Sequence, residues 1–203
     1  MPLQNRITPF GALIATPARG TLMGNRGCLH DAERRIRRAF AVKRWIICLL
    51  EFEGRHRPVM APGQYTELFF LDEATALAAG HRPCAECQRA RYDLFRERWT
   101  GGRSALPGAD ALDAALHAER LGRDGAKRTY RERPSRLPPG TIVADDSGVA
   151  WLVHESGLLR WTAAGYTRNS PAPADRSLRV LTPRSTVRVL ARGYPVAVHA
   201  SAG

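Results

Sequence analysis

Two cysteines separated by two residues, Cys84 and Cys87, form a short motif in a chain of 203 residues that holds only four cysteines. They lie between a predicted short helix, Glu73–Ala79, which ends at Gly80, and a predicted amphipathic helix, Ala85–Trp99. The C-x-x-C spacing presents two thiolates to one zinc ion, which takes four ligands in a tetrahedron. Thiol redox motifs share this spacing but usually follow a β-strand. The preceding helix therefore favours a metal site with these two cysteines as ligands.

The segment Glu73–Gln88 (EATALAAGHRPCAECQ) resembles the second half of the metal-binding domain of the Ada family of bacterial alkylation-repair and regulatory proteins. The similarity covers about residues 66–89 and rests on an Ala- and Leu-rich helix followed by Ala-Gly-x-Arg-Pro-Cys-x-x-Cys-Gln. It implies that Cys84 and Cys87 are zinc thiolates and that Arg82 lies near bound DNA. In that family an upstream cysteine pair supplies a thiolate that accepts a methyl group from the DNA backbone. The corresponding positions here, Glu53 and Arg57, are not thiols.

The third and fourth ligands have three alternative compositions. In the first, Cys28 and His30 complete the site, because neighbouring glycines allow a tight turn and residues two apart in an extended segment point to the same side. In the second, Cys48 or His56 takes part instead. In the third, the chain holds no structural metal and the cysteines are packing residues or weak redox thiols. We favour the first set, because Cys48 lies in the apolar run Ile46–Leu50 and is interpreted there as a small buried hydrophobic residue.

The chain carries 31 lysines and arginines against 19 aspartates and glutamates, which gives a net charge of +12. A surface of this charge attracts polyanions, so we expect nucleic acid as the partner, DNA rather than RNA. The alternative is a basic protein without that role. The expected contacts combine the arginine implied by the resemblance, arginines of the helix after the cysteine pair, and a basic loop: Arg82, Arg89, Arg91, Lys127, Arg128 and Arg131.

Glycines, prolines and apolar runs divide the chain into three parts. Residues 1–100 hold all four cysteines and are expected to form a small zinc-binding domain. Residues 101–139 are expected to form a helical and basic connector. Residues 140–203 are expected to form a short antiparallel β-sheet or a partly open barrel, because short apolar segments alternate with turn residues. The predicted fold class is therefore α+β.

The secondary structure outside the motif follows from apolar runs and from the residues that interrupt them. Asp72 is a suitable N-cap for the short helix before the cysteines. The remaining expected helix is Ala109–Leu121, and the expected strands are Arg44–Phe52, Thr66–Leu71, Thr141–Ala144, Val149–His154, Leu158–Thr162, Leu178–Leu181 and Thr186–Leu190.

Several functional classes lose support. The apolar patch Ala12–Thr16 is shorter than the core of a secretory signal, and no run is long enough to span a membrane, so we expect a cytoplasmic protein. Nucleotide-binding glycine motifs and the G-x-S-x-G nucleophile motif do not occur. We therefore expect nucleic-acid binding beside a structural zinc site rather than catalysis. Two enzymatic alternatives are methyl transfer to a zinc-bound cysteine and a metal-dependent nuclease built around Asn25, His30 and Asp31.

Overall fold

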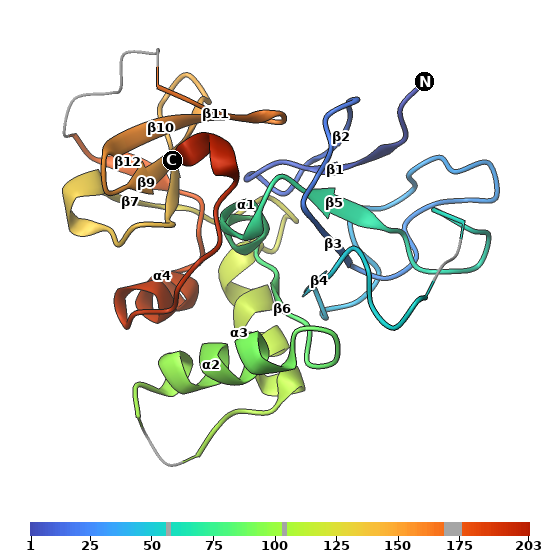
Figure 1. Ribbon diagram of the computed structural model, residues 1–203, viewed down its shortest axis with the longest axis horizontal. Helices are drawn as coiled ribbons and strands as arrows, with labels where there is room; N and C mark the ends of the chain where they lie inside the picture. The colour runs from blue at the N-terminus through green and yellow to red at the C-terminus, as the bar shows by residue number, and fades with distance from the viewer. Residues whose placement is uncertain (56–57, 103–104, 169–175) are drawn as a thin grey trace.

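The computed structural model describes residues 1–55, 58–102, 105–168 and 176–203 of the chain. Within these residues the structure contains four α-helices and two six-stranded, mostly antiparallel sheets, which confirms the α+β class (Figure 1). The first sheet comes from the N-terminal half of the chain and the second from the C-terminal half. The helix that precedes the cysteine pair lies between them (Figure 1).

The first sheet is built from six short strands in the spatial order β2-β1-β5-β3-β4-β6. Two neighbouring pairs, β1 with β5 and β4 with β6, are parallel, and the other neighbours are antiparallel. The strands are β1 (Gln4–Ile7), β2 (Leu13–Ala15), β3 (Leu22–Asn25), β4 (Ile46–Cys48), β5 (Leu68–Phe70) and β6 (Arg82–Pro83).

The second sheet is antiparallel throughout, in the order β11-β10-β9-β8-β12-β7. Its strands are β7 (Tyr130–Glu132), β8 (Ile142–Ala144), β9 (Ala150–His154), β10 (Gly157–Thr162), β11 (Gly165–Thr167) and β12 (Leu178–Val180), with short 3-10 helices at Pro134–Arg136 and Ala200–Ala202. The hairpins expected over residues 141–162 are confirmed. One edge strand, β7, comes from the segment expected to be a connector.

The four helices are α1 (Glu73–Ala78), α2 (Arg89–Thr100), α3 (Ala109–Arg120) and α4 (Arg184–Ala191). The predicted caps of α1 are confirmed: the Asp72 carboxylate accepts the Thr75 backbone N–H at 2.8 Å, and Gly80 has a left-handed φ of +93°. Helix α2 begins at Arg89, four residues later than expected, because residues 85–88 form the turn that carries the cysteines.

The strand expected at Thr186–Leu190 is wrong, because these residues belong to α4. Thr186, Val189 and Leu190 are buried on one side of the helix, a spacing that fits a helical period rather than alternation along a strand. The first turn is held by Glu119, whose carboxylate accepts the Ser185 backbone N–H at 2.8 Å and its hydroxyl at 2.6 Å. A negative charge at this position stabilises the start of a helix.

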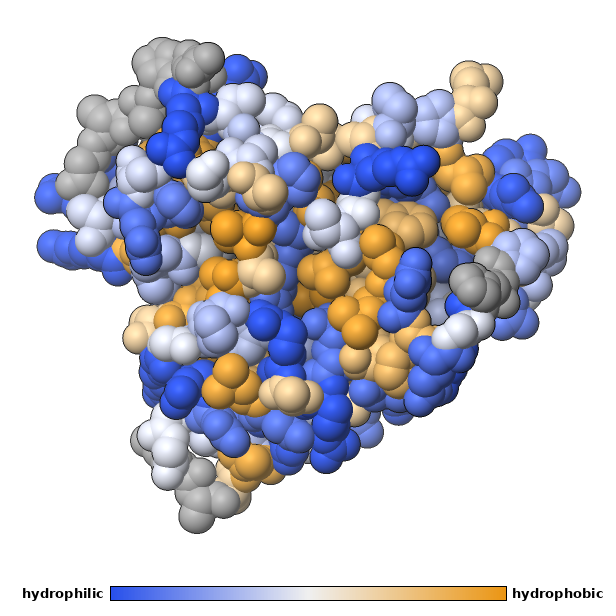
Figure 2. Space-filling model, viewed as in Figure 1, coloured by the Kyte–Doolittle hydropathy of each residue, from blue (hydrophilic) through white to orange (hydrophobic). Residues whose placement is uncertain are grey.

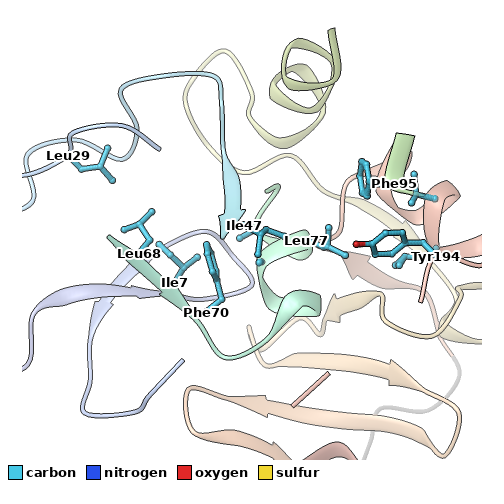
Figure 3. Close-up of a cluster of buried hydrophobic side chains, with 12 residues drawn as sticks. Ile7, Leu29, Ile47, Leu68, Phe70, Leu77, Phe95 and Tyr194 are labelled. Carbon is cyan, nitrogen blue, oxygen red and sulfur yellow. The ribbon is translucent and has the colours of Figure 1, made fainter. Parts of the chain in front are cut away.

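The hydrophobic core crosses the boundaries expected from the sequence. One cluster joins buried residues of the first sheet to Leu77 of α1, Phe95 of α2 and Tyr194 after α4 (Figure 3). A second cluster packs Leu71, Ala74 and Ala78 against the second sheet. Helix α1 is therefore buried between the two sheets. Figure 2 shows apolar residues gathered in the middle of one face, with hydrophilic residues around them.

Two buried carboxylates at the start of α1 bind the C-terminal segment. Asp72 accepts hydrogen bonds from the Tyr166 hydroxyl at 2.8 Å and from the His199 backbone N–H at 2.9 Å. Glu73 accepts the Tyr194 hydroxyl at 2.6 Å and also pairs with Arg91. These contacts fix α1, and with it the turn that carries the cysteines, against the second half of the chain. No helix in the described ranges has the length and apolar character to cross a bilayer.

Candidate metal centre

Three cysteines meet where two parallel strands of the first sheet end. Ile47 of β4 pairs with Pro83 of β6, so Cys48 and Cys84 are the next residues on neighbouring strands. The Cys84 backbone N–H donates to the Ile47 carbonyl at 2.9 Å. The Gln88 side-chain amide donates to the same carbonyl at 2.9 Å and draws the following turn, with Cys87, back towards β4.

The three sulfur atoms all lie within 4.8 Å of one another. Cys48 and Cys84 are buried, with exposed fractions of 9% and 8%, and Cys87 is half-buried. Three thiols at this spacing could hold a metal ion. They form the only group of three or more His, Cys, Asp or Glu ligands close enough to do so within the residues that the structure describes.

Hydrogen bonds to sulfur favour the thiolate form at two of the three positions. The Cys48 thiol donates to Cys84, and this bond, with the backbone N–H groups of Glu86 and Cys87, lowers the pKa of Cys84 to about 5. The pKa of Cys87 is lowered first by Cys48 and also by the Leu49 backbone N–H. The pKa of Cys48 is raised by its bonds to the other two sulfurs and by burial. Hydrogen bonding therefore favours the thiolate form of Cys84 and of Cys87, the form in which a cysteine binds a metal ion.

The cysteines open onto a cavity of about 520 Å³. Its wall combines apolar residues of the first sheet with the charged side chains of Arg55, Glu67 and Glu86. Arg55 forms an ion pair with Glu86 at 2.8 Å, so a cation and an anion lie at the same rim. The sulfur cluster is therefore buried on the strand side and reachable from the cavity side.

The structure places the favoured ligands Cys28 and His30 outside this cluster. In the β3–β4 pair Met23 lies opposite Cys48 and Asn25 lies opposite Ile46, so the chain after β3 leads away from Cys48. The His30 ring is occupied by hydrogen bonds with the Thr66 hydroxyl at 2.6 Å and the Ala61 carbonyl at 3.2 Å.

The sulfur of Cys28 lies 3.7 Å from the His30 carbonyl oxygen, as a local contact within its own turn. The expected set of four is therefore corrected to a cluster of three in which Cys48 joins Cys84 and Cys87. The reserve ligand His56 lies outside the described residues.

Three of the six expected nucleic-acid contacts have partners within the protein: Arg82 is buried, and Arg91 and Lys127 are half-buried. Arg82 is 2% exposed and donates to both carboxylate oxygens of Asp113, at 3.1 and 2.7 Å. Arg91 is paired with buried Glu73. The Lys127 ammonium donates to the Ala78 carbonyl at 2.6 Å. The contact implied for Arg82 is corrected, because a guanidinium enclosed in this way cannot reach a phosphate.

The other three expected contacts lie on the surface. Arg89 begins α2 and pairs with Asp93 at 2.9 Å, Arg131 of β7 pairs with Asp146 at 3.0 Å, and Arg128 donates to the Ala118 carbonyl at 2.7 Å. Exposed ion pairs of this kind are weak, so the Arg89 and Arg131 guanidiniums can exchange their carboxylate partners for a phosphate.

The residues considered for a nuclease have other roles. Asp31 is paired with Arg35 and Arg37 at the surface, and its pKa is lowered by hydrogen bonds from the Arg35 backbone and from both guanidiniums. His30 is buried against Thr66, as described above. They do not form a metal-binding group in the described part of the chain.

Comparisons with protein-family models, with curated proteins and with solved structures found no match. The resemblance to the Ada metal-binding domain therefore stays a prediction from the motif alone. The ligand that sequence reasoning set aside was Cys48. The sequence holds no local signal for this role; in the structure the pairing of β4 with β6 places Cys48, the last residue of β4, beside Cys84, the residue after β6.

Proposed function

We propose that the protein holds one zinc ion through Cys48, Cys84 and Cys87 and binds nucleic acid, DNA in particular, on the basic surface beside this centre. The observation that carries the proposal is the grouping of three sulfur atoms within 4.8 Å, supported by hydrogen bonds that favour thiolates. Sulfur ligands select zinc, copper(I) or iron–sulfur clusters, and among these zinc suits a C-x-x-C turn with one further thiolate. Bound zinc would keep all three thiols deprotonated at neutral pH.

The charge of the chain supports nucleic acid as the partner. The net charge is +12, and Arg89 is exposed at the start of α2, two residues after Cys87. Arg55 lies at the rim of the cavity onto which the cysteines open. A metal ion that fixes this turn would hold Arg55 and Arg89 in a constant geometry. This constant geometry favours their contact with phosphates.

The nucleic-acid part is tested by titrating a labelled DNA duplex at several salt concentrations. We expect the logarithm of the binding constant to fall linearly with the logarithm of the salt concentration, by about 0.9 for each phosphate contacted. Arg89→Gln should weaken binding and reduce this slope by about one contact.

Arg98→Gln is the matched control, because it removes the same charge from the other end of α2, about 13 Å along the helix axis. A binding constant that does not depend on salt contradicts the proposal. Equal effects of the two variants would show that Arg89 is not a specific contact.

A second candidate function is acceptance of an alkyl group by one of the thiolates. The cavity beside the cysteines favours it, because closed structural zinc sites take four protein ligands, whereas reactive sites keep one position open. A thiolate would attack the methyl carbon of a methylphosphotriester. The sulfur–carbon bond forms as the carbon–oxygen bond breaks, and the electron pair stays on the phosphodiester oxygen.

Intact-mass measurement after incubation with methylphosphotriester DNA tests this candidate, with unmethylated DNA as the control. Stoichiometric gain of the mass of one methylene group supports it. An unchanged mass in protein that carries zinc and binds the DNA contradicts alkyl transfer and leaves the binding function intact.

A further inference from the structure

Two buried guanidiniums and one half-buried lysine gather beside Trp45, at the other end of β4 from the cysteines. Arg26 and Arg120 are each 1% exposed, and each guanidinium carbon lies 3.8 Å from a Trp45 ring centroid. Lys127 reaches the same region, where its ammonium donates to the Ala78 carbonyl at 2.6 Å. Cation–π contact stabilises one guanidinium on an indole, but two guanidiniums and an ammonium at one place also repel each other.

The hydrogen bonds of these cations go to neutral groups. Arg26 donates to the Gly11 carbonyl at 2.9 Å and to Nε2 of His81 at 3.2 Å. Arg120 donates to the carbonyls of Gly80 at 2.9 Å and Lys43 at 2.6 Å. Nη2 of Arg26 and Nε of Arg120 are buried without a hydrogen-bond partner within the described residues.

The acid that attracts Arg120 does not neutralise the three cations. Asp113 attracts Arg120 electrostatically, but both of its carboxylate oxygens accept hydrogen bonds from Arg82. Burial and the Arg120 charge lower the pKa of Arg26 to about 9, and burial with the charges of Arg26 and Arg120 lowers the pKa of Lys127 to about 7. Burying a charge is costly unless an opposite charge accompanies it, so this arrangement favours the binding of an anion.

A cavity lies beside the three cations and offers space for an anion. It has a volume of about 200 Å³, and Arg26, Arg120 and Lys127 all line it, with the aromatic rings of Phe10 and Phe40 at its wall. This volume holds several water molecules or one small tetrahedral oxyanion, since a water molecule takes about 30 Å³ in the liquid. The cavity shares no lining residue with the one beside the cysteines.

We propose that this cavity is a binding site for a phosphoryl oxyanion, held by Arg26, Arg120 and Lys127. Two guanidiniums supply paired N–H donors that match the oxygens of phosphate, and the ammonium supplies a third point of charge. A phosphate dianion neutralises most of the charge of the three cations, which a single carboxylate does not. The phosphoryl group comes either from free phosphate or a phosphate monoester, or from a nucleic-acid backbone. The site needs no metal and goes beyond the function proposed above.

Calorimetric titration with inorganic phosphate tests the site, with sodium chloride at matched ionic strength as the reference. We expect saturable binding of one phosphate per chain and a rise in the melting temperature with phosphate concentration. Lys127→Met should weaken binding at least about tenfold, because it removes one charged donor. Arg131→Met, which removes an exposed charge, should leave the affinity unchanged.

Two results would overturn the proposal: heats that do not saturate in the wild-type protein, or an unchanged phosphate affinity in Lys127→Met. The wild-type titration decides the question even if an arginine variant at this site does not fold. The stability of phosphate-free Lys127→Met is the folding control: removal of a cation that faces two guanidiniums offsets the loss of its hydrogen bond to the Ala78 carbonyl, so the variant should stay folded.

Competition between phosphate and a DNA duplex identifies the source of the group. If phosphate displaces the duplex and Lys127→Met weakens both, the site holds a backbone phosphate. If phosphate binds equally well with and without saturating duplex, the site holds free phosphate or a monoester. Either result supports the site and names its ligand.

Discussion

Cys48 and Cys84 directly follow Ile47 and Pro83, two residues that pair across the parallel strands β4 and β6. This register brings a cysteine from an apolar strand to a C-x-x-C turn that lies 36 residues further along the chain. The pairing is fixed by the backbone, because the Cys84 N–H donates to the Ile47 carbonyl at 2.9 Å. The sulfur cluster therefore depends on the sheet as much as on the motif.

Removal of the metal is expected to loosen only the segments that carry the cysteines. The turn after Cys84 and the chain after Cys48 are held through sulfur, whereas the three hydrophobic clusters are assembled from other residues of both sheets and the helices. After treatment with a chelator, hydrogen exchange should accelerate at residues 49–52 and 85–88 and stay unchanged in β9 and β10. Loss of protection throughout the chain would contradict this prediction.

The buried pair of Arg82 and Asp113 is expected to contribute to stability rather than to nucleic-acid binding. Arg82→Met leaves the Asp113 carboxylate buried without its cation, which should lower the free energy of unfolding by about 3–5 kcal/mol in chemical denaturation. DNA affinity per folded molecule should not change. The control Arg89→Gln should show the reverse pattern, with a stability change within about 0.5 kcal/mol and weaker DNA binding. A loss of affinity without a loss of stability in Arg82→Met would restore this residue as a contact.

Of the acidic residues, Asp72 is expected to be the one whose substitution lowers the stability of the fold most. Its carboxylate accepts hydrogen bonds from Thr75, Tyr166 and His199, and so joins α1 to the second half of the chain. Asp72→Ala leaves these buried donors unpaired and should cost about 3 kcal/mol in urea denaturation. Asp124→Ala, which removes one exposed turn bond, should cost less than about 1 kcal/mol. Similar losses in the two variants would count against the role of Asp72.

Stability in the absence of phosphate is expected to rise with pH above neutrality. Burial beside Arg26 and Arg120 lowers the pKa of Lys127 from 10.5 to about 7 in the folded protein. Between about pH 7 and 10.5 the unfolded chain therefore binds more protons than the folded one, and the free energy of unfolding increases with pH. Below pH 7 both states carry the charge, and the full cost of burying it is present.

Urea denaturation across this pH range measures the effect. The increase should be smaller in Lys127→Met. Arg26 and Arg120, whose pKa values are lowered to about 9, also titrate in this range and contribute in both proteins, whereas buried His81 stays neutral. Equal pH profiles for the wild type and the variant would show that Lys127 is not the titrating group.

Local signals in the sequence predicted much of the fold. The caps of α1, the extent of α3 and the hairpins β8–β10 follow from short-range turn and cap chemistry, which acts within a few residues. Helix α4 was mistaken for a strand because five residues are too few to separate the two periodicities. Strands β1 to β3 escaped notice, since their pairing is set by partners far along the chain.

The candidate site likewise combines residues that the sequence indicates locally with residues whose role depends on distant partners. Cys84 and Cys87 are recognisable because their spacing is local, and the structure brings them together. Cys48 was read as a core residue because its neighbours Ile47 and Leu49 are apolar, and only the β4–β6 register reveals its sulfur partners. The hydrogen bonds of Arg82 and Lys127 likewise go to distant partners, Asp113 and Ala78, that composition does not disclose.

Metal analysis of protein purified without added zinc tests the central claim most directly. The wild type and Cys28→Ser should each retain about one zinc ion per chain, whereas Cys48→Ser should retain less than about a tenth of that amount, because three thiolates are required to hold the ion. Full retention of zinc by Cys48→Ser, or its loss from Cys28→Ser, would contradict the site formed by Cys48, Cys84 and Cys87.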